Sequence, residues 1–190
     1  MKQTLFLMSF LLGSILQAAP LEYSFLVDTS AFNNTSGQLE FSFLPGGVPV
    51  TDAATATITG FSGGILGATS SIGAVTGSLA ATLRIDNTEQ LNQFIQDLTF
   101  GPSFKFHLQI AGQLVDNPQD FIGTLFLLNR ITNGGDDTTN LINIDIIPTL
   151  EPIVNTDESV TQPAAVVPEP TSVLILGLAV PAVYWMRRRR

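Results

Sequence analysis

The sequence has no cysteine and a single histidine, His107. Without cysteine the chain can form neither a disulfide nor a thiolate metal site, so the hydrophobic core alone must stabilise the fold. One histidine cannot supply the several nitrogen or sulfur ligands of a zinc site. A Ser-His-Asp triad would have to use His107, yet no Gly-x-Ser-x-Gly sequence accompanies it. We therefore expect His107 to be an exposed polar residue on a strand, and we assign no catalytic residue.

Basic residues are also scarce. The chain has eight, and five of them lie at its two ends, as Lys2 and the run 187–190. Between Glu22 and Glu169, sixteen acidic residues face only Arg84, Lys105 and Arg130, which gives this region a formal charge of −13. Such a charge repels phosphate backbones and disfavours nucleic-acid binding. It suits an extracellular module, including one that loosely collects divalent cations.

Long hydrophobic runs occur only near the ends. A basic start at Lys2 precedes an apolar stretch over 5–16, which is short for a bilayer span and has the length of a signal-peptide core. Ala18 and Ala19 follow as small residues, and cleavage after Ala19 would place Pro20 directly beyond the cut bond. We expect a signal peptide at 1–18, cleaved after Ala18, and export through the Sec translocon.

The second hydrophobic run covers 171–186 and reads as a transmembrane helix at the short edge of the required length. Tyr184 and Trp185 lie where an aromatic belt would. The run ends in a basic, membrane-stop tail: Arg187, Arg188, Arg189 and Arg190. The positive-inside rule keeps this tail cytoplasmic and places the upstream chain outside, in agreement with the signal peptide.

Directly before this helix stands Pro168-Glu169-Pro170. The tripeptide, the helix and the arginine cluster, in that order, resemble the PEP-CTERM sorting signal over residues 168–190. The resemblance implies recognition by exosortase, a membrane transpeptidase of Gram-negative bacteria that would cut near Pro168, Glu169 and Pro170. It also implies an inner-membrane-anchored precursor that becomes a cell-surface or extracellular protein, in bacteria that make exopolysaccharide and biofilm. The alternative is an ordinary single-span anchor.

Residues 148–167 are rich in proline and acidic residues. Proline at this density favours extended conformations and removes the N–H donors that a sheet needs. We expect this segment to be a linker that holds the domain away from the membrane.

Residues 19–147 are expected to form one β-rich ectodomain. Apolar and polar residues alternate in short runs, as they do in half-buried antiparallel strands. The runs are 23–27, 39–43, 54–59, 79–85, 104–110, 121–128 and 142–146. The run 121–128 is apolar on both faces and should be central. With glycine-rich turns between the runs, the pattern predicts an all-β fold, a β-sandwich of jelly-roll or Greek-key kind.

One segment departs from this pattern. Leu91, Phe94, Ile95 and Leu98 follow helical spacing, and Asn87 with Gln90 would make a helix start. The sequence thus predicts one short helix packed on the sheets.

The domain is also similar to an uncharacterised group of PEP-CTERM proteins. The similarity rests on Val27-Asp28-Thr29-Ser30, Thr35-Ser36-Gly37, Pro45-Gly46-Gly47, the run from Ala54 to Phe61, and Leu98-Thr99-Phe100-Gly101. It supports the domain boundaries and implies no catalytic residue.

Asn133, Asp136, Asp137 and Asn140 form an oxygen-rich segment. Asp136 and Asp137 are weak candidates for binding Ca²⁺, but the spacing is not that of an EF-hand, and Asn-Gly-Gly-Asp is first a hairpin turn. Otherwise no cofactor is expected.

Three functions remain open. The first is a non-catalytic, exported surface or matrix protein sorted by exosortase and associated with exopolysaccharide. The second is a lectin-like, carbohydrate-binding module, and the third is a secreted glycan hydrolase that uses two carboxylates.

Overall fold

The alternating segments build two antiparallel sheets in the computed structural model, which describes residues 19–47, 50, 52–116, 118–119, 122–135 and 137–161. From Pro20 onward, these residues belong to one compact unit. Sheet A has the order β12 (Val160–Thr161), β1 (Leu21–Asp28), β8 (Ser103–Gly112), β3 (Ala54–Ser62), β6 (Thr82–Asp86) and β5 (Val75–Gly77).

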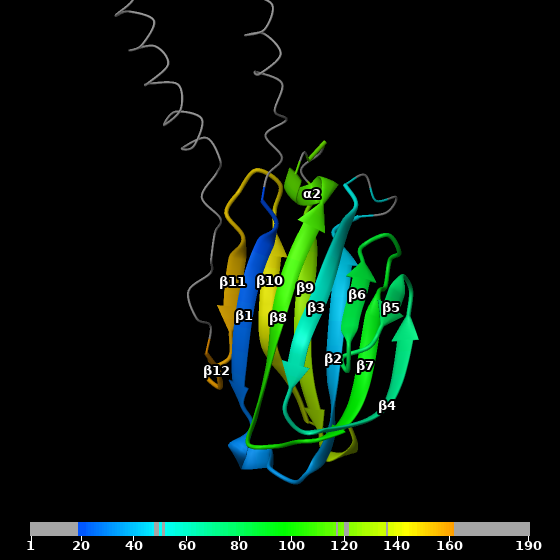
Figure 1. Ribbon diagram of the computed structural model, residues 1–190. Coiled ribbons are helices and arrows are strands. Elements are labelled where there is room, and N and C mark those ends of the chain that lie inside the picture. Colours follow the sequence, from blue (N-terminus) through cyan, green and yellow to red (C-terminus); the bar gives the residue numbers. More distant parts are fainter. Residues whose placement is uncertain are drawn as a thin grey trace, which may run out of the picture. The chain divides into compact units, whose positions relative to one another are not determined.

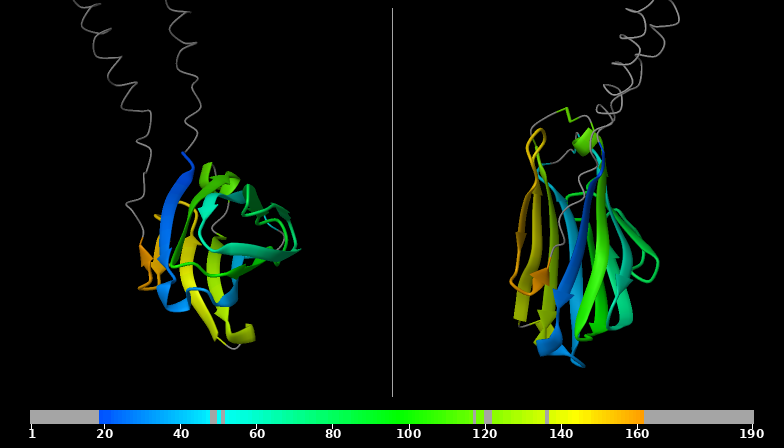
Figure 2. Two further views of the ribbon diagram at one scale, coloured as in Figure 1. Left: turned by 60° about the horizontal axis from the view of Figure 1, so that its bottom comes forward. Right: turned by 60° about the vertical axis from the view of Figure 1, so that its left-hand side comes forward.

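Sheet B lies behind sheet A in Figure 1, and Figure 2 shows the two layers from other sides. Its order is β11 (Ile153–Thr156), β10 (Asp137–Ile146), β9 (Thr124–Thr132), β2 (Ser36–Pro45), β7 (Gln93–Thr99) and β4 (Ile65–Ile72). The described helical segments are short: η1 (Ser30–Phe32), α2 (Gln113–Asp116) and η2 (Asn133–Gly135). The prediction of an all-β sandwich is thus confirmed at the level of two packed antiparallel sheets.

The core fills the space between the sheets. Period-two alternation turns every second side chain inward, and phenylalanine supplies much of the volume. Phe25 and Phe106 pack at 5.3 Å between ring centroids within sheet A, and Phe106 meets Phe41 of sheet B at 5.7 Å, edge to face. Such contacts add to the large apolar area that each ring buries. The strand β9 lies between β10 and β2, which confirms the central position predicted for the run 121–128 over its described strand residues, 124–128.

The helix predicted around Leu91–Leu98 is wrong, because this segment forms β7. The inward-facing positions of β7 are Phe94, Gln96 and Leu98. The buried Gln96 interrupts the apolar side of the period-two pattern, and the outward-facing Ile95 then completes a false helical spacing. The short α-helix of the described chain is α2, which directly follows β8.

The expected linker also needs correction. Part of 148–167 belongs to the sandwich: β11 pairs with β10 in sheet B, and β12 pairs with β1 in sheet A. Pro148 and Pro152 precede β11 without lying in it. The ectodomain therefore continues to at least Thr161.

No helix among the described residues is both long and apolar enough to cross a membrane. The predicted signal peptide at 1–18 and the predicted transmembrane helix at 171–186 lie outside the described residues.

Candidate functional site

On the outer face of sheet A, polar side chains from neighbouring strands form rows that run across the sheet. Along β8, the buried Phe104, Phe106 and Leu108 alternate with exposed residues that point away from sheet B. His107 is one of the exposed residues, which confirms the prediction from its position in the alternation. The neighbouring strands β1 and β3 contribute polar residues to the same face, because directly paired residues on adjacent strands face the same side.

Six polar side chains from these three strands line a shallow cavity of about 440 Å³. One row joins Ser24 to His107 and His107 to Thr59, and the next joins Glu22 to Gln109 and Gln109 to Thr57. We name this cavity the sheet A site and define it by its polar residues: Glu22, Ser24, Thr57, Thr59, His107 and Gln109.

Hydrogen bonds between β1 and β8 fix part of the sheet A site. The Ser24 hydroxyl lies 2.7 Å from His107 Nδ1, and Gln109 Nε2 donates to Glu22 Oε1 at 2.9 Å. The buried Tyr23 lies between these two pairs on β1. Burial, reinforced by the charge of Glu151, raises the pKa of its hydroxyl, so it stays protonated at neutral pH.

Serine and histidine are two of the three residue types of a nucleophilic triad, but Ser24 and His107 have no third partner of the required kind among the described residues of the site. Glu22 is the only acid among the described residues that line the site, and its carboxylate accepts a hydrogen bond from Gln109. A serine is activated when a base takes its proton and a carboxylate orients that base. The arrangement instead offers a set of exposed donors and acceptors to a polar ligand.

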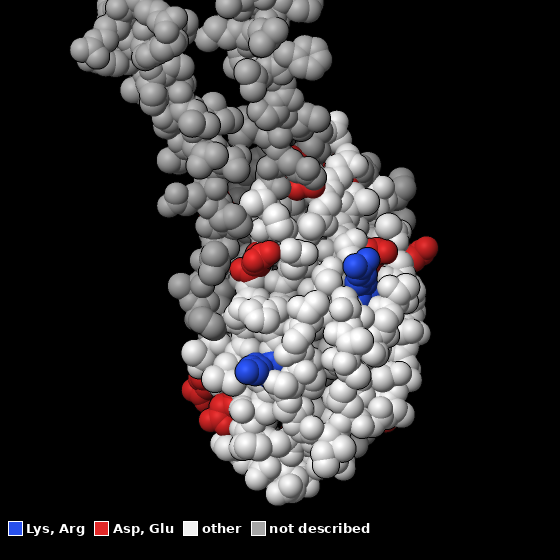
Figure 3. Space-filling view, in the orientation of Figure 1, with Lys and Arg blue, Asp and Glu red and all other residues white. Residues whose placement is uncertain are grey.

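Two cations flank the sheet A site. Arg84 of β6 pairs with Thr57, and Lys105 lies two residues before His107 on β8. Figure 3 shows two separate basic side chains on this face, together with several acidic side chains on a mostly uncharged surface. Two of the three basic residues between Glu22 and Glu169, Arg84 and Lys105, point outward on this face.

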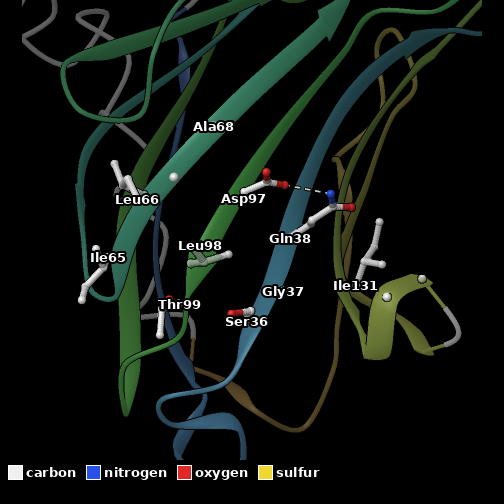
Figure 4. Close-up of a pocket in the computed structure, with 13 residues that line it drawn as sticks. Ser36, Gly37, Gln38, Ile65, Leu66, Ala68, Asp97, Leu98, Thr99 and Ile131 are labelled. Atoms are coloured by element: carbon white, nitrogen blue, oxygen red, sulfur yellow. Dashed lines mark hydrogen bonds between the residues drawn. The ribbon is translucent and has the colours of Figure 1, made fainter.

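A second hollow, of about 520 Å³, crosses the outer face of sheet B from β4 to η2. Gln38 of β2 donates from Nε2 to Asp97 Oδ1 of β7 at 2.8 Å across its floor (Figure 4). Ser36 and Thr99 add hydroxyls, and Ile65 and Ile131 make two of its walls apolar. Among the described residues that line this groove, the one carboxylate is that of Asp97, which accepts a hydrogen bond from the Gln38 amide.

Only part of the segment that holds the calcium candidates lies within the described residues. Asp136 lies outside the described residues, and Asp137 is exposed at the start of β10. The residues Asn133–Gly135 form η2 and connect β9 to β10, as the hairpin interpretation predicts. In the part of the chain that the structure describes, no group of three or more His, Asp or Glu side chains could hold a metal ion.

The residues predicted for sorting cannot be placed. Ala18, Pro168, Glu169, Pro170 and the arginine tail, 187–190, all lie outside the described residues. Their assignment remains a prediction from sequence.

The sequence reveals His107 but not its neighbours in the sheet A site. Ser24 lies 83 residues from His107 along the chain. Their strands, β1 and β8, are far apart in sequence but adjacent in sheet A. The alternating run 54–59 places Thr57 and Thr59 on one face of β3, and both line the site. Knowledge of strand order was the missing information.

Comparison with known protein families, curated proteins and solved structures found no match to this chain.

Proposed function

We propose that this chain is an exported, non-catalytic surface protein whose β-sandwich binds an extracellular polysaccharide on the sheet A site. The observation that carries the binding proposal is the cavity itself, in which six polar side chains from three adjacent strands converge. Sugar hydroxyls both donate and accept hydrogen bonds. Gln109 supplies an amide, His107 an imidazole and Glu22 an acceptor, so the site can match such a ligand.

The shape and charge of the face suit a polymer. The rows of the sheet A site run across strands that lie side by side, so a chain could extend over several of them. Arg84 and Lys105 reduce the local repulsion that the acidic domain would otherwise exert on uronic acids or other anionic sugars.

Polysaccharide hydrolysis is less well supported. Most glycosidases need two carboxyl groups on either side of the scissile bond. The described lining of the sheet A site has one acid, Glu22, and that of the sheet B groove has one, Asp97. Each of the two is hydrogen-bonded to a glutamine. We therefore favour binding without turnover.

Affinity electrophoresis tests the binding proposal. The full-length chain, solubilised in detergent, is run through gels that contain purified exopolysaccharide from the producing cells. We expect retardation that increases with polysaccharide concentration. His107→Ala and Gln109→Ala should each weaken the apparent affinity about fivefold, since each removes hydrogen-bonding groups worth about 1 kcal/mol.

The matched control is Asn155→Ala, which removes an exposed amide from β11 in the other sheet. It should leave retardation unchanged. Equal retardation of the wild-type chain and of both sheet A variants would contradict the proposed site, and no retardation of the wild type would contradict polysaccharide binding.

The export and sorting proposal rests on the sequence of the two ends. We infer that the precursor is inserted through the Sec translocon, anchored in the inner membrane by 171–186 and processed by exosortase near Pro168-Glu169-Pro170. Mass spectrometry of the native C-terminus tests this proposal in cells with and without exosortase. A mature end near Pro168 to Thr171 that depends on exosortase supports it, and a tail intact through Arg190 in both strains contradicts it.

A further inference from the structure

The edges of the two sheets differ sharply in length. The edge strands β12, β5 and β11 have two, three and four residues. The fourth, β4, has eight residues, none of them charged, and all except Leu66 are exposed. It forms the right-hand edge of the molecule in Figure 1, and no described residue pairs with its outer side. Free N–H and C=O groups along such an edge are a template for another strand.

Two exposed isoleucines lie at the ends of β4. Ile65 is 72% exposed and Ile72 is 54% exposed. Ile65 pairs with Thr99 and Ile72 with Gln93, which are outward-facing positions of β7 because they alternate with the buried Leu98 and Phe94. Both isoleucines therefore project from the outer face of sheet B.

A β-bulge gives the two isoleucines this common direction. In a regular strand, residues separated by an odd number of positions face opposite sides. The pairing of β4 with β7 shifts between Leu66 and Thr69, and the buried Gln96 stabilises the shift by donating from Nε2 to Gly67 O at 3.0 Å. The extra residue restores Ile65 and Ile72 to one face.

This arrangement is complementary to itself. If β4 pairs antiparallel with β4 of a second copy about a two-fold axis between Ala68 and Thr69, Ile65 of each copy lies opposite Ile72 of the other. Two Ile–Ile pairs then form on the same face, one at each end of the interface. The bulges of the two copies then lie on either side of the axis, between the two Ile–Ile pairs. A bulge ordinarily discourages edge pairing, but in this register it aligns the apolar ends.

We propose that β4 is a dimerisation edge, through which two copies of this chain join their B sheets into one continuous sheet. A two-fold dimer uses the same edge on both copies and closes the assembly. Head-to-tail assembly would instead pair β4 with the much shorter β11 edge.

The described part of the chain does not cover the outer edge of β4, so the edge is accessible to a second copy. The last described residue, Thr161, lies in β12, and β12 and β5 are the opposite edges of sheet A. Five strand spacings of about 4.8 Å separate these edges. Figure 1 shows β5 and β4 on the same side of the molecule, so the described chain ends at the side away from β4.

Disulfide crosslinking tests this register, because the wild-type chain has no cysteine. The full-length chain in detergent is oxidised and analysed on non-reducing gels as Ile65→Cys, as Ile72→Cys and as the double variant. Directly paired residues in the proposed register have Cα atoms about 4.5–5.5 Å apart, within disulfide range. Within one chain the two positions are about 23 Å apart, which excludes an intramolecular bond.

We expect the double variant, and an equimolar mixture of the two single variants, to form a covalent dimer that a reductant dissociates. Each single variant alone should stay at the monomer mass, because its cysteines would be on opposite ends of the interface. The substituted side chains are exposed, so the substitutions should leave the fold intact, which circular dichroism checks. Dimers from a single variant alone would overturn the register, and no dimer from either the double variant or the mixture would overturn the proposal.

Discussion

At the scale of single residues, two buried asparagines explain how the chain passes from sheet A to sheet B after β6. Asn87 and Asn92 are both at most 1% exposed. Asn87 Oδ1 accepts from Ala54 N, and Asn92 Oδ1 accepts from Ala74 N. Their Nδ2 groups donate to oxygens that include Asp52 O and Phe43 O. The two side chains thus bind the crossover segment, 87–92, to backbone N–H and C=O groups of neighbouring segments.

Replacing Asn92 with alanine should destabilise the fold. Ala74 N–H and Phe43 C=O would lose their side-chain partner in a buried site, so we expect the free energy of unfolding to fall by about 1–3 kcal/mol. Urea unfolding followed by circular dichroism measures the change. The exposed Asn155→Ala should change it by less than about 0.5 kcal/mol. Equal losses of unfolding free energy from the two substitutions would show that the buried Asn92 amide does not stabilise the crossover segment.

A second residue, Asp157, shapes the turn between β11 and β12. Its Oδ1 accepts from the Ser159 hydroxyl at 2.7 Å and from Ser159 N at 2.9 Å. These two hydrogen bonds, with a smaller contribution from Arg130, lower the pKa of the Asp157 carboxyl below its ordinary value. The ionised form therefore stabilises the folded state.

The sign of the pH effect follows from the lowered pKa. The stabilisation by Asp157 is present above the pKa of an unfolded aspartate, about 3.9, and is lost as pH falls through the lower folded value. The urea concentration at the midpoint of unfolding should fall between pH 5 and pH 3 in the wild type. We expect this fall to be smaller in Asp157→Asn. A decrease as steep as that of the wild type would contradict this role.

At the scale of elements, the arch from β3 to β4 carries the chain between the two sheets through Gly63 and Gly64. Gly63 has a φ of 120°, and a Cβ built on it would lie 2.3 Å from Ser103 O and 2.7 Å from Phe104 Cα. Those contacts are backbone atoms at the start of β8, so they cannot move aside independently. The arch needs glycine for both its conformation and its packing.

Gly134 provides a matched comparison for Gly63. It also has a positive φ, 70°, but no atom lies within 4 Å of its Cβ position. Gly134→Ala should lower the free energy of unfolding by about 1 kcal/mol through backbone conformation alone. Gly63→Ala should lower it by at least about 1 kcal/mol more, because steric overlap adds to the conformational cost. Equal losses in urea unfolding would contradict the close approach at Gly63.

Elements with regular burial could be predicted from sequence, and those without it could not. Strands such as β2, β3, β8 and β10 have an apolar side chain at nearly every inward position. The inward side of β7 includes Gln96, and nearly all of β4 is exposed, so neither strand shows a clean alternation. The site followed the same rule: the outward direction of His107 was predictable, but its contact with Ser24 depends on strand order.

At the scale of the whole molecule, the last described segment ties the two sheets together. The strand β11 extends sheet B, and β12 extends sheet A only a few residues later. Asp157 N donates to Leu141 O at 2.9 Å, and Asp28 N donates to Ser159 O at 2.8 Å. Val154 and Val160 pack against the core. The segment therefore closes one side of the sandwich.

Truncation distinguishes this closing segment from a linker. A chain that ends at residue 161 should keep the stability of the ectodomain, since all described strands remain. A chain that ends at 147 loses β11 and β12, and with them the burial of two valines, so its free energy of unfolding should be lower by about 1–3 kcal/mol. Thermal and urea unfolding of the two chains, each without residues 1–18, measure the difference. Identical stability would restore the linker interpretation for the whole of 148–167.

The central claim is that a polysaccharide occupies the sheet A site, and the single histidine of the chain gives the most direct test. Diethylpyrocarbonate modifies imidazole, and its absorbance change at histidine can come only from His107. The rate of modification is measured on the full-length chain with and without saturating exopolysaccharide. Protection of His107 that rises with polysaccharide concentration is the predicted result, and an unchanged rate at saturation would contradict the claim.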